Sequence, residues 1–187
     1  IFLSLIGCPT TLFTKRQLKK EQFENIKYKF EYTTSGYYDF EIVENKTFEI
    51  KYRKFETEIN KCFESSLFAS YLENSTAIGA FIADKLIGFI EYTNETWNNR
   101  LRITNILVFE PYRNKKIGSK LFEIVYQRAK AASSRMIVLE TQSCNEKAIS
   151  FYFNLGFNVI GFDLYSYSNR DLDNKEVRIE LGKIIAV

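Results

Sequence analysis

Two segments combine residue types that could carry chemistry, and the first is a basic loop between an apolar run and a helical pattern. The apolar run ends near Val108, Pro111 follows it, and residues 113–116 (Arg-Asn-Lys-Lys) precede Gly118. A strand that leads through such a loop into a helix would present the free N–H groups of the first turn, where the helix dipole favours negative charge. We expect Gly118 to let a ligand approach the backbone closely. The segment fits a pyrophosphate site, although an ordinary solvated basic loop explains it equally well on its own.

The second segment joins an acidic strand end to the start of a helix. Glu140 would lie near the end of a buried strand, and Asn145 would cap the helix that follows a short polar loop. Tyr152 would lie two turns into this helix, and Gly156 would end it. In the simpler interpretation, Glu140 is an exposed charge, Asn145 is only a cap and Tyr152 is half-buried core.

The composition limits which residues could move protons. The chain has no histidine among its 187 residues, which excludes Ser-His-Asp and Cys-His systems as usually built and His-ligated metal sites. Proton transfer would fall to carboxylates, tyrosine, lysine, cysteine or water. Cys8, Cys62 and Cys144 are widely spaced and form no C-x-x-C motif. We therefore expect no disulfide framework and no metal, and a reducing, cytoplasmic setting.

Charge and hydropathy argue against two classes of partner. The net charge is only +3, with a mild basic excess after residue 100, whereas a nucleic-acid binder concentrates basic residues on one face. No apolar run approaches the ~20 residues that span a bilayer, so we expect neither a nucleic-acid nor a membrane partner. Residues 1–8 are apolar and end in Leu5-Ile6-Gly7-Cys8, similar to a lipoprotein cleavage box. Without a basic region before them, we expect a short buried or frayed segment. Because the chain begins with Ile and not with Met, the sequence leaves open whether residues precede it.

The hydrophobic patterns predict the elements that must position these segments. They indicate one mixed α/β domain over residues 1–187, with a central sheet and an N-terminal extension, partly helical, over residues 1–36. The predicted helices cover residues 15–28, 56–72, 115–132 and 145–154. The predicted strands cover residues 37–43, 47–55, 77–83, 86–93, 101–109, 136–141, 157–166 and 176–183.

Residues 77–168 resemble the GCN5-related N-acetyltransferase (GNAT) superfamily. Residues 113–118 are similar to its acetyl-CoA loop, Arg/Gln-x-x-Gly-x-Gly/Ala, and Asn145-x-x-Ala-x-x-Phe-Tyr152-x-x-x-Gly156-Phe is similar to its second signature. Lys116 departs from the pattern, because the family usually has its first glycine there. With ordinary helical geometry, Lys116 would still donate its N–H. The resemblance implies the GNAT fold, a central, mostly antiparallel twisted sheet flanked by helices.

The resemblance also implies a reaction, which is direct acetyl transfer from acetyl-CoA to an amine. Tyr152 would protonate the leaving thiolate, and Glu140 would act as the base through water, as in the similar Glu/Tyr pair of ribosomal-protein alanine acetyltransferases. Glu91 is a reserve base, although a solvated strand glutamate is its simpler role. The implied cofactor-binding residues are Leu107, Val108, Arg113, Asn114, Lys115, Lys116, Ile117, Gly118, Ser119, Asn145 and Tyr152.

Several short segments narrow the range of acceptor molecules that the resemblance implies. Trp97-Asn98 and residues 103–106, 139–142, 151–152 and 161–165 look like streptothricin acetyltransferases, which acetylate the β-lysine amine of an antibiotic. Those relatives typically carry Glu-Asp where this chain has Thr104-Asn105, which weakens the case for a polycationic acceptor. The candidate acceptor contacts are Trp97, Glu91 and Asn105. The alternatives are a peptide N-terminus or lysine as acceptor, or a non-catalytic acyl-CoA-binding module, and a homodimer remains open.

Overall fold

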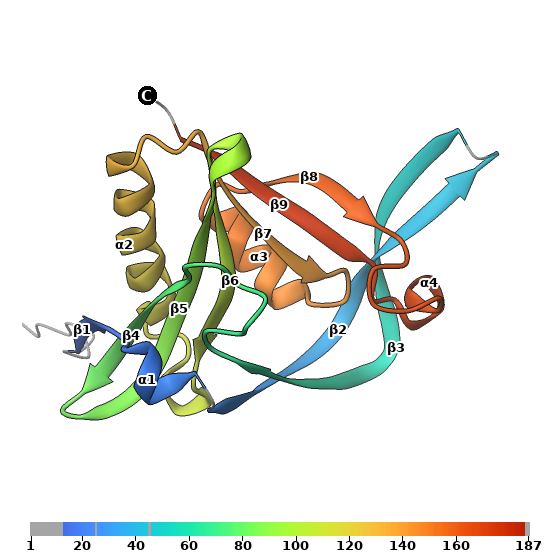
Figure 1. Ribbon diagram of the computed structural model, residues 1–187. Coiled ribbons are helices and arrows are strands. Elements are labelled where there is room, and N and C mark those ends of the chain that lie inside the picture. Colours follow the sequence, from blue (N-terminus) through green and yellow to red (C-terminus); the bar gives the residue numbers. More distant parts are fainter. Residues whose placement is uncertain (1–12, 25, 45, 186–187) are drawn as a thin grey trace, which may run out of the picture.

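The computed structural model describes residues 13–24, 26–44 and 46–185, and its centre is a seven-stranded sheet in the order β1-β4-β5-β6-β7-β9-β8 (Figure 1). Every neighbouring pair in this sheet is antiparallel except β6 and β7, which run parallel. This confirms the predicted mixed α/β fold with a mostly antiparallel sheet. The strands are β1 (Thr14–Gln17), β4 (Thr76–Ile82), β5 (Lys85–Glu95), β6 (Arg100–Val108), β7 (Met136–Gln142), β8 (Asn158–Asp163) and β9 (Arg178–Ile184).

Two helices cover one face of the sheet, α2 (Ile117–Ala131) and α3 (Glu146–Asn154). In α2, Ile117, Leu121 and Val125 recur every fourth residue and are buried in the main core with apolar residues of the central strands. Both helices confirm their sequence predictions to within two residues. The described part also contains two single-turn α-helices, α1 (Lys20–Phe23) and α4 (Asp171–Asn174), and two 3₁₀ helices, Thr96–Asn98 and Glu110–Tyr112. None of these helices is long and apolar enough to cross a membrane.

A long hairpin of β2 (Lys27–Val43) and β3 (Thr47–Ser66) extends away from the sheet (Figure 1). The predicted strands 37–43 and 47–55 are confirmed, but the predicted helices over 15–28 and 56–72 are wrong. Ile59 and Phe63 lie four residues apart, a spacing that puts side chains on one face of either a helix or a strand. Pairing with β2 decides for the strand, because Phe63 stacks on Phe30 with ring centroids 4.9 Å apart. The expectation for residues 1–8 lies outside the described residues.

The parallel strands β6 and β7 separate along their length. Their pairing is limited to Arg100–Arg102 against Met136–Val138 in the described part of the chain. Two residues further on, β6 bulges at Thr104, since Glu91 pairs with Asn105 while Tyr92 pairs with Ile103. The carboxyl ends of these strands lie at the same edge of the sheet, and from there the chain enters α2 and α3. The two segments singled out in the sequence are therefore neighbours in space.

Candidate functional site

The loop before α2 holds two residues in the left-handed region. Asn114 has φ 61° and Lys116 has φ 59°, so the condition of ordinary helical geometry at Lys116 is not met. Lys116 instead adopts the conformation that a glycine would take most easily. Left-handed residues in such a turn direct successive N–H groups to one side, which makes a concavity suited to anions.

The first turn of α2 adds further donors. The first backbone bond of the helix joins Lys120 N to Lys116 O at 3.1 Å, so Ile117, Gly118 and Ser119 have no helical acceptor for their N–H groups. No side chain caps this end. The arrangement fits the predicted pyrophosphate site, with positive charge from Lys115 and Lys116.

Arg113 and Gly118 also contribute to contacts within the protein. Arg113 turns back, donating from Nε to Val108 O at 3.0 Å and from Nη2 to Glu31 O at 3.1 Å, so it ties the loop to β6 and β2. A Cβ added at Gly118 would lie 3.3 Å from Phe151 Cζ and 3.8 Å from Val108 Cγ2. The glycine therefore lets α2 pack closely on α3 and β6.

Lys116 gives a stability prediction. Lys116→Gly should leave the free energy of unfolding within about 1 kcal/mol of wild type, because relief of the left-handed backbone offsets the greater entropy of unfolded glycine. Lys116→Ile should lower it by about 1–2 kcal/mol, since a β-branched residue tolerates this region poorly. Urea unfolding measures both. Equal losses in the two variants would contradict the left-handed geometry.

Tyr152 is a core residue of α3, only 6% exposed. Its ring lies 5.7 Å from that of Phe157, and its hydroxyl has no hydrogen bond to another described residue. Burial raises the pKa of the Tyr152 phenol, so the hydroxyl stays protonated at neutral pH. At the start of the same helix, Asn145 Oδ1 accepts from Ala148 N at 3.3 Å, which is the predicted cap.

The raised pKa of Tyr152 predicts an alkaline loss of stability. Above pH 10 the unfolded chain loses the tyrosine proton while the folded chain retains it, so folding stability falls as pH rises. Each such tyrosine contributes a slope of about 1.4 kcal/mol per pH unit in this range. Urea midpoints from pH 9 to 11.5 should fall less steeply in Tyr152→Phe than in wild type. Parallel curves for the two proteins would contradict the burial of the phenol.

Glu140 lies on β7 with its carboxylate paired to an arginine. Arg178 Nε is 2.7 Å from Glu140 Oε2. The preceding residue, Leu139, is buried in the same core cluster as Tyr152, so strand alternation directs Glu140 to the opposite face. No contact joins Glu140 to Tyr152 in the described structure. The two could reach one reacting group only where β6 and β7 separate.

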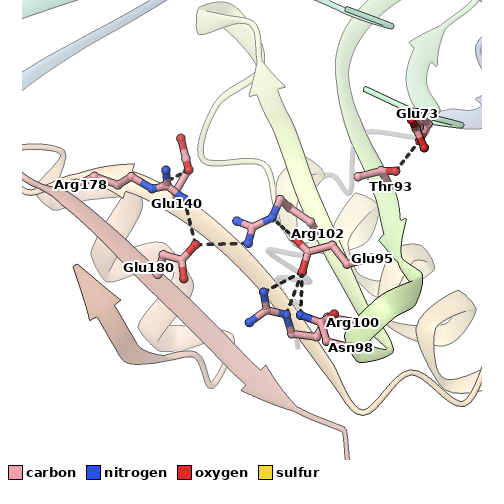
Figure 2. Close-up of polar contacts among 9 residues, drawn as sticks. All are labelled: Glu73, Thr93, Glu95, Asn98, Arg100, Arg102, Glu140, Arg178 and Glu180. Carbon is pink, nitrogen blue, oxygen red and sulfur yellow. Dashed lines mark hydrogen bonds and ion pairs between the residues drawn. The ribbon is translucent and has the colours of Figure 1, made fainter. Parts of the chain in front are cut away.

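Glu140 belongs to an Arg–Glu network on the face of the sheet opposite α2 (Figure 2). Arg178 and Arg102 both contact Glu180 Oε1, at 3.0 and 3.2 Å. Arg102 also contacts Glu95, whose Oε2 is 2.8 Å from Arg100 Nη2. Burial opposes ionisation of Glu95, but the hydrogen bonds from Arg102 and Arg100 outweigh it and lower its pKa. The members of the network are Glu95, Arg100, Arg102, Glu140, Arg178 and Glu180.

The sequence prediction missed most of this network. Arg102, Arg178 and Glu180 come from β6 and β9, and only the strand order brings them to Glu140. The available signal was alternation, because Arg102 lies between two buried apolar residues, Leu101 and Ile103.

The candidate acceptor residues lie in contrasting surroundings. Trp97 is 83% exposed, beside the Arg100 guanidinium at 5.8 Å. Glu91 is 0% exposed, so the interpretation of Glu91 as a solvated strand residue is wrong. Asn105 donates from Nδ2 to Glu91 Oε2 at 2.7 Å. The described residues contain no cluster of Cys, Asp or Glu that could hold a metal ion.

Comparisons with known proteins agree with this geometry. The Acetyltransferase (GNAT) family model matches residues 40–157. Streptothricin acetyltransferase of Escherichia coli is 38% identical over 98 residues, which are 52% of this chain and 56% of that protein. The chain spans about half the length of the relatives that it matches in this way.

Solved structures resemble almost the whole chain. The crystal structure of nourseothricin acetyltransferase superposes with a TM-score of 0.75 at 22% identity, covering 93% of this chain and 99% of that one. A Bacillus anthracis (strain Ames) structure, described as a streptothricin acetyltransferase in complex with acetyl coenzyme A, superposes with a TM-score of 0.74 at 24% identity. The match covers 95% of this chain and 99% of that one. At these identities the likeness shows the fold. Because the family model itself matches well over half of the sequence, the chain belongs to the GNAT family of acetyltransferases.

Proposed function

We propose that this chain is an acetyl-CoA-dependent N-acetyltransferase that modifies a primary amine of a small molecule, with a streptothricin-type antibiotic as acceptor. The observation that carries the proposal is the position of the α2 N-terminus. Its left-handed loop residues and free N–H groups follow the carboxyl end of β6, whose second half has no β7 partner in the described structure. A ligand with a phosphate end and an extended arm matches that combination.

The residues of this region suggest how acetyl-CoA would be held. The N–H groups of Ile117, Gly118 and Ser119 would bind the pyrophosphate, with charge from Lys115 and Lys116. The edge of β6 beyond Arg102 has no β7 partner in the described structure, so Leu107 and Val108 would offer backbone groups to the pantetheine arm. Bound acetyl-CoA would supply the acetyl thioester.

The chain's own groups would manage the protons. We assign the base to Glu140, acting through water, because an ammonium acceptor must lose a proton before it can attack. We assign the acid to Tyr152, whose buried phenol stays protonated and can donate to the leaving thiolate. Backbone N–H groups of the diverging part of β6 would stabilise the developing oxyanion.

The acceptor assignment rests on the similarity to streptothricin acetyltransferases. Acetylation of such an antibiotic would confer resistance. We place the enzyme in the cytoplasm, since Cys62 and Cys144 are free thiols, as expected in a reducing compartment.

The test is acetyl-CoA-dependent release of free thiol with streptothricin, a set of small amines and polyamines, and peptides with free N-termini or lysine. Turnover with streptothricin alone is the expected result. Turnover only with peptides would favour the peptide alternative and overturn the antibiotic acceptor. Acetyl-CoA binding by calorimetry without thiol release for any acceptor would overturn the proposed activity.

A further inference from the structure

We propose that Glu91 is a positioning residue that orients Thr104 and Asn105 so that their oxygen atoms accept hydrogen bonds from the acceptor amine. The inference rests on the proposed function and names the groups that would recognise its acceptor. It starts from a glutamate side chain that is completely buried and has no lysine or arginine beside it among the described residues.

Glu91 lies on β5 with both carboxylate oxygens in hydrogen bonds. Oε1 accepts from Phe68 N at 2.7 Å and from Ser75 Oγ at 2.9 Å. Oε2 accepts from Thr104 Oγ1 at 3.0 Å and from Asn105 Nδ2 at 2.7 Å. No lysine or arginine of the described residues forms an ion pair with it. Four neutral donors therefore compensate the burial of this carboxylate.

The contacts fall at a special point of the sheet. Thr104 is the bulged residue of β6, opposite the step between Glu91 and Tyr92. A bulge puts two residues of one strand opposite a single residue of its neighbour, and here both side chains reach the same oxygen. The bulge follows directly after the last β6–β7 pair, Arg102 with Val138. Glu91 therefore fixes side chains where the two parallel strands begin to separate.

Glu91, Thr104 and Asn105 lie on the face of the sheet opposite α2, which we propose as the face that receives the acceptor. Tyr92 points toward α2, where its hydroxyl accepts from Arg128 Nη1 at 2.7 Å, so the adjacent Glu91 points away from α2. Arg102 of the Arg–Glu network lies on this same face, since its neighbours Leu101 and Ile103 are buried in the cluster that includes α2. Thr104 and Asn105 are only partly buried there.

The contacts with Glu91 determine the orientation of its two partners. Asn105 turns its NH₂ group toward Glu91 Oε2, which leaves its Oδ1 on the other side. The Thr104 hydroxyl must likewise use its proton on Glu91 and keep its lone pairs free. Oδ1 has no hydrogen bond to another described residue. Two oxygen acceptors thus face away from the buried carboxylate, which suits an amine or ammonium donor.

The experiment is a double-mutant cycle in the thiol-release assay with streptothricin. Glu91→Gln can donate from its own amide and so removes the constraint on Asn105, while Asn105→Leu removes the amide at similar size. Each single variant should raise the KM for the acceptor about tenfold, the scale of one hydrogen bond to a charged group, and leave the KM for acetyl-CoA unchanged. The double variant should exceed Asn105→Leu by no more than about threefold, the share expected from Thr104, because Glu91 acts only through Asn105 and Thr104.

Two further variants separate positioning from loss of structure. Thr93 lies on β5 like Glu91, and its Oγ1 donates to Glu73 O (Figure 2). Thr93→Val removes this hydrogen bond and should leave both KM values unchanged. If Glu91→Gln does not fold, Thr104→Val tests the same prediction at the partly exposed end of the contact, with an expected rise of about threefold in the acceptor KM.

The outcomes also separate this inference from the proposed function. Three results would overturn the role of Glu91 but leave the proposed function intact. They are effects that multiply in the double variant, equal changes in the KM values for acceptor and acetyl-CoA, and an unchanged acceptor KM in variants of an active wild type. A wild type that binds acetyl-CoA but acetylates no amine would overturn the proposed function, and this inference with it.

Discussion

Tyr152→Phe is expected to lower kcat by about 10- to 1,000-fold, the range for loss of one general acid, with little change in affinity for acetyl-CoA. The hydroxyl is the only atom removed, and it makes no hydrogen bond to another described residue. The ring packs among Phe151 and Phe157 in the core, and phenylalanine can keep that packing. The measurements are thiol release under saturating substrates and calorimetry with acetyl-CoA.

A matched control is available on the neighbouring helix. Tyr126 of α2 is also part of an aromatic contact, with its ring 6.1 Å from that of Phe122, and Tyr126→Phe should retain wild-type kcat. A free thiolate leaves more easily when a proton donor is near the sulfur, so a less basic leaving group, in an acyl donor with an acidified thiol, should partly restore Tyr152→Phe. Wild-type turnover by Tyr152→Phe under saturating conditions would remove the phenol from the mechanism.

The half of the fold that carries the two candidate segments could be predicted from the sequence. In residues 101–154 each apolar run has one dominant period, which is why β6, α2, β7 and α3 match their predictions closely. The N-terminal part failed where the period is ambiguous. Spacings of four, as between Ile59 and Phe63, fit both a helix and a strand, and only the long pairing with β2 resolves them.

The candidate site divides in the same way. The α2 loop and Tyr152 belong to short local motifs, so their places in the secondary structure could be predicted from the sequence. The left-handed geometry of Lys116 could not be predicted, because lysine gives no signal for positive φ. The environment of Glu91 could not be predicted either, because its four hydrogen-bond donors come from three separate segments of the chain. Such contacts depend on strand order and on a bulge.

Glu140→Gln gives the second large expected effect, a fall in kcat/KM of about 100-fold that is greatest at low pH. At low pH the acceptor is almost entirely ammonium, so the reaction depends most on a group that removes the proton. At high pH part of the acceptor is already the free amine, and the difference from wild type should narrow. The measurement is the pH profile of kcat/KM for the acceptor in both proteins.

The ion pair with Arg178 requires a control, because Glu140→Gln also removes one of the two carboxylates that contact that guanidinium. Glu180 pairs with Glu140 in the β7–β9 register and contacts the same arginine at 3.0 Å. Glu180→Gln therefore disturbs the Arg–Glu network comparably without touching the proposed base, and its pH profile should keep the shape of the wild type. If both variants lose activity equally at every pH, the network only supports the sheet and water alone serves as base. A pH-dependent loss confined to Glu140→Gln would mean that the carboxylate takes the proton while still paired with arginine. Arg178 would then fix the position of that carboxylate on the face of the sheet opposite α2.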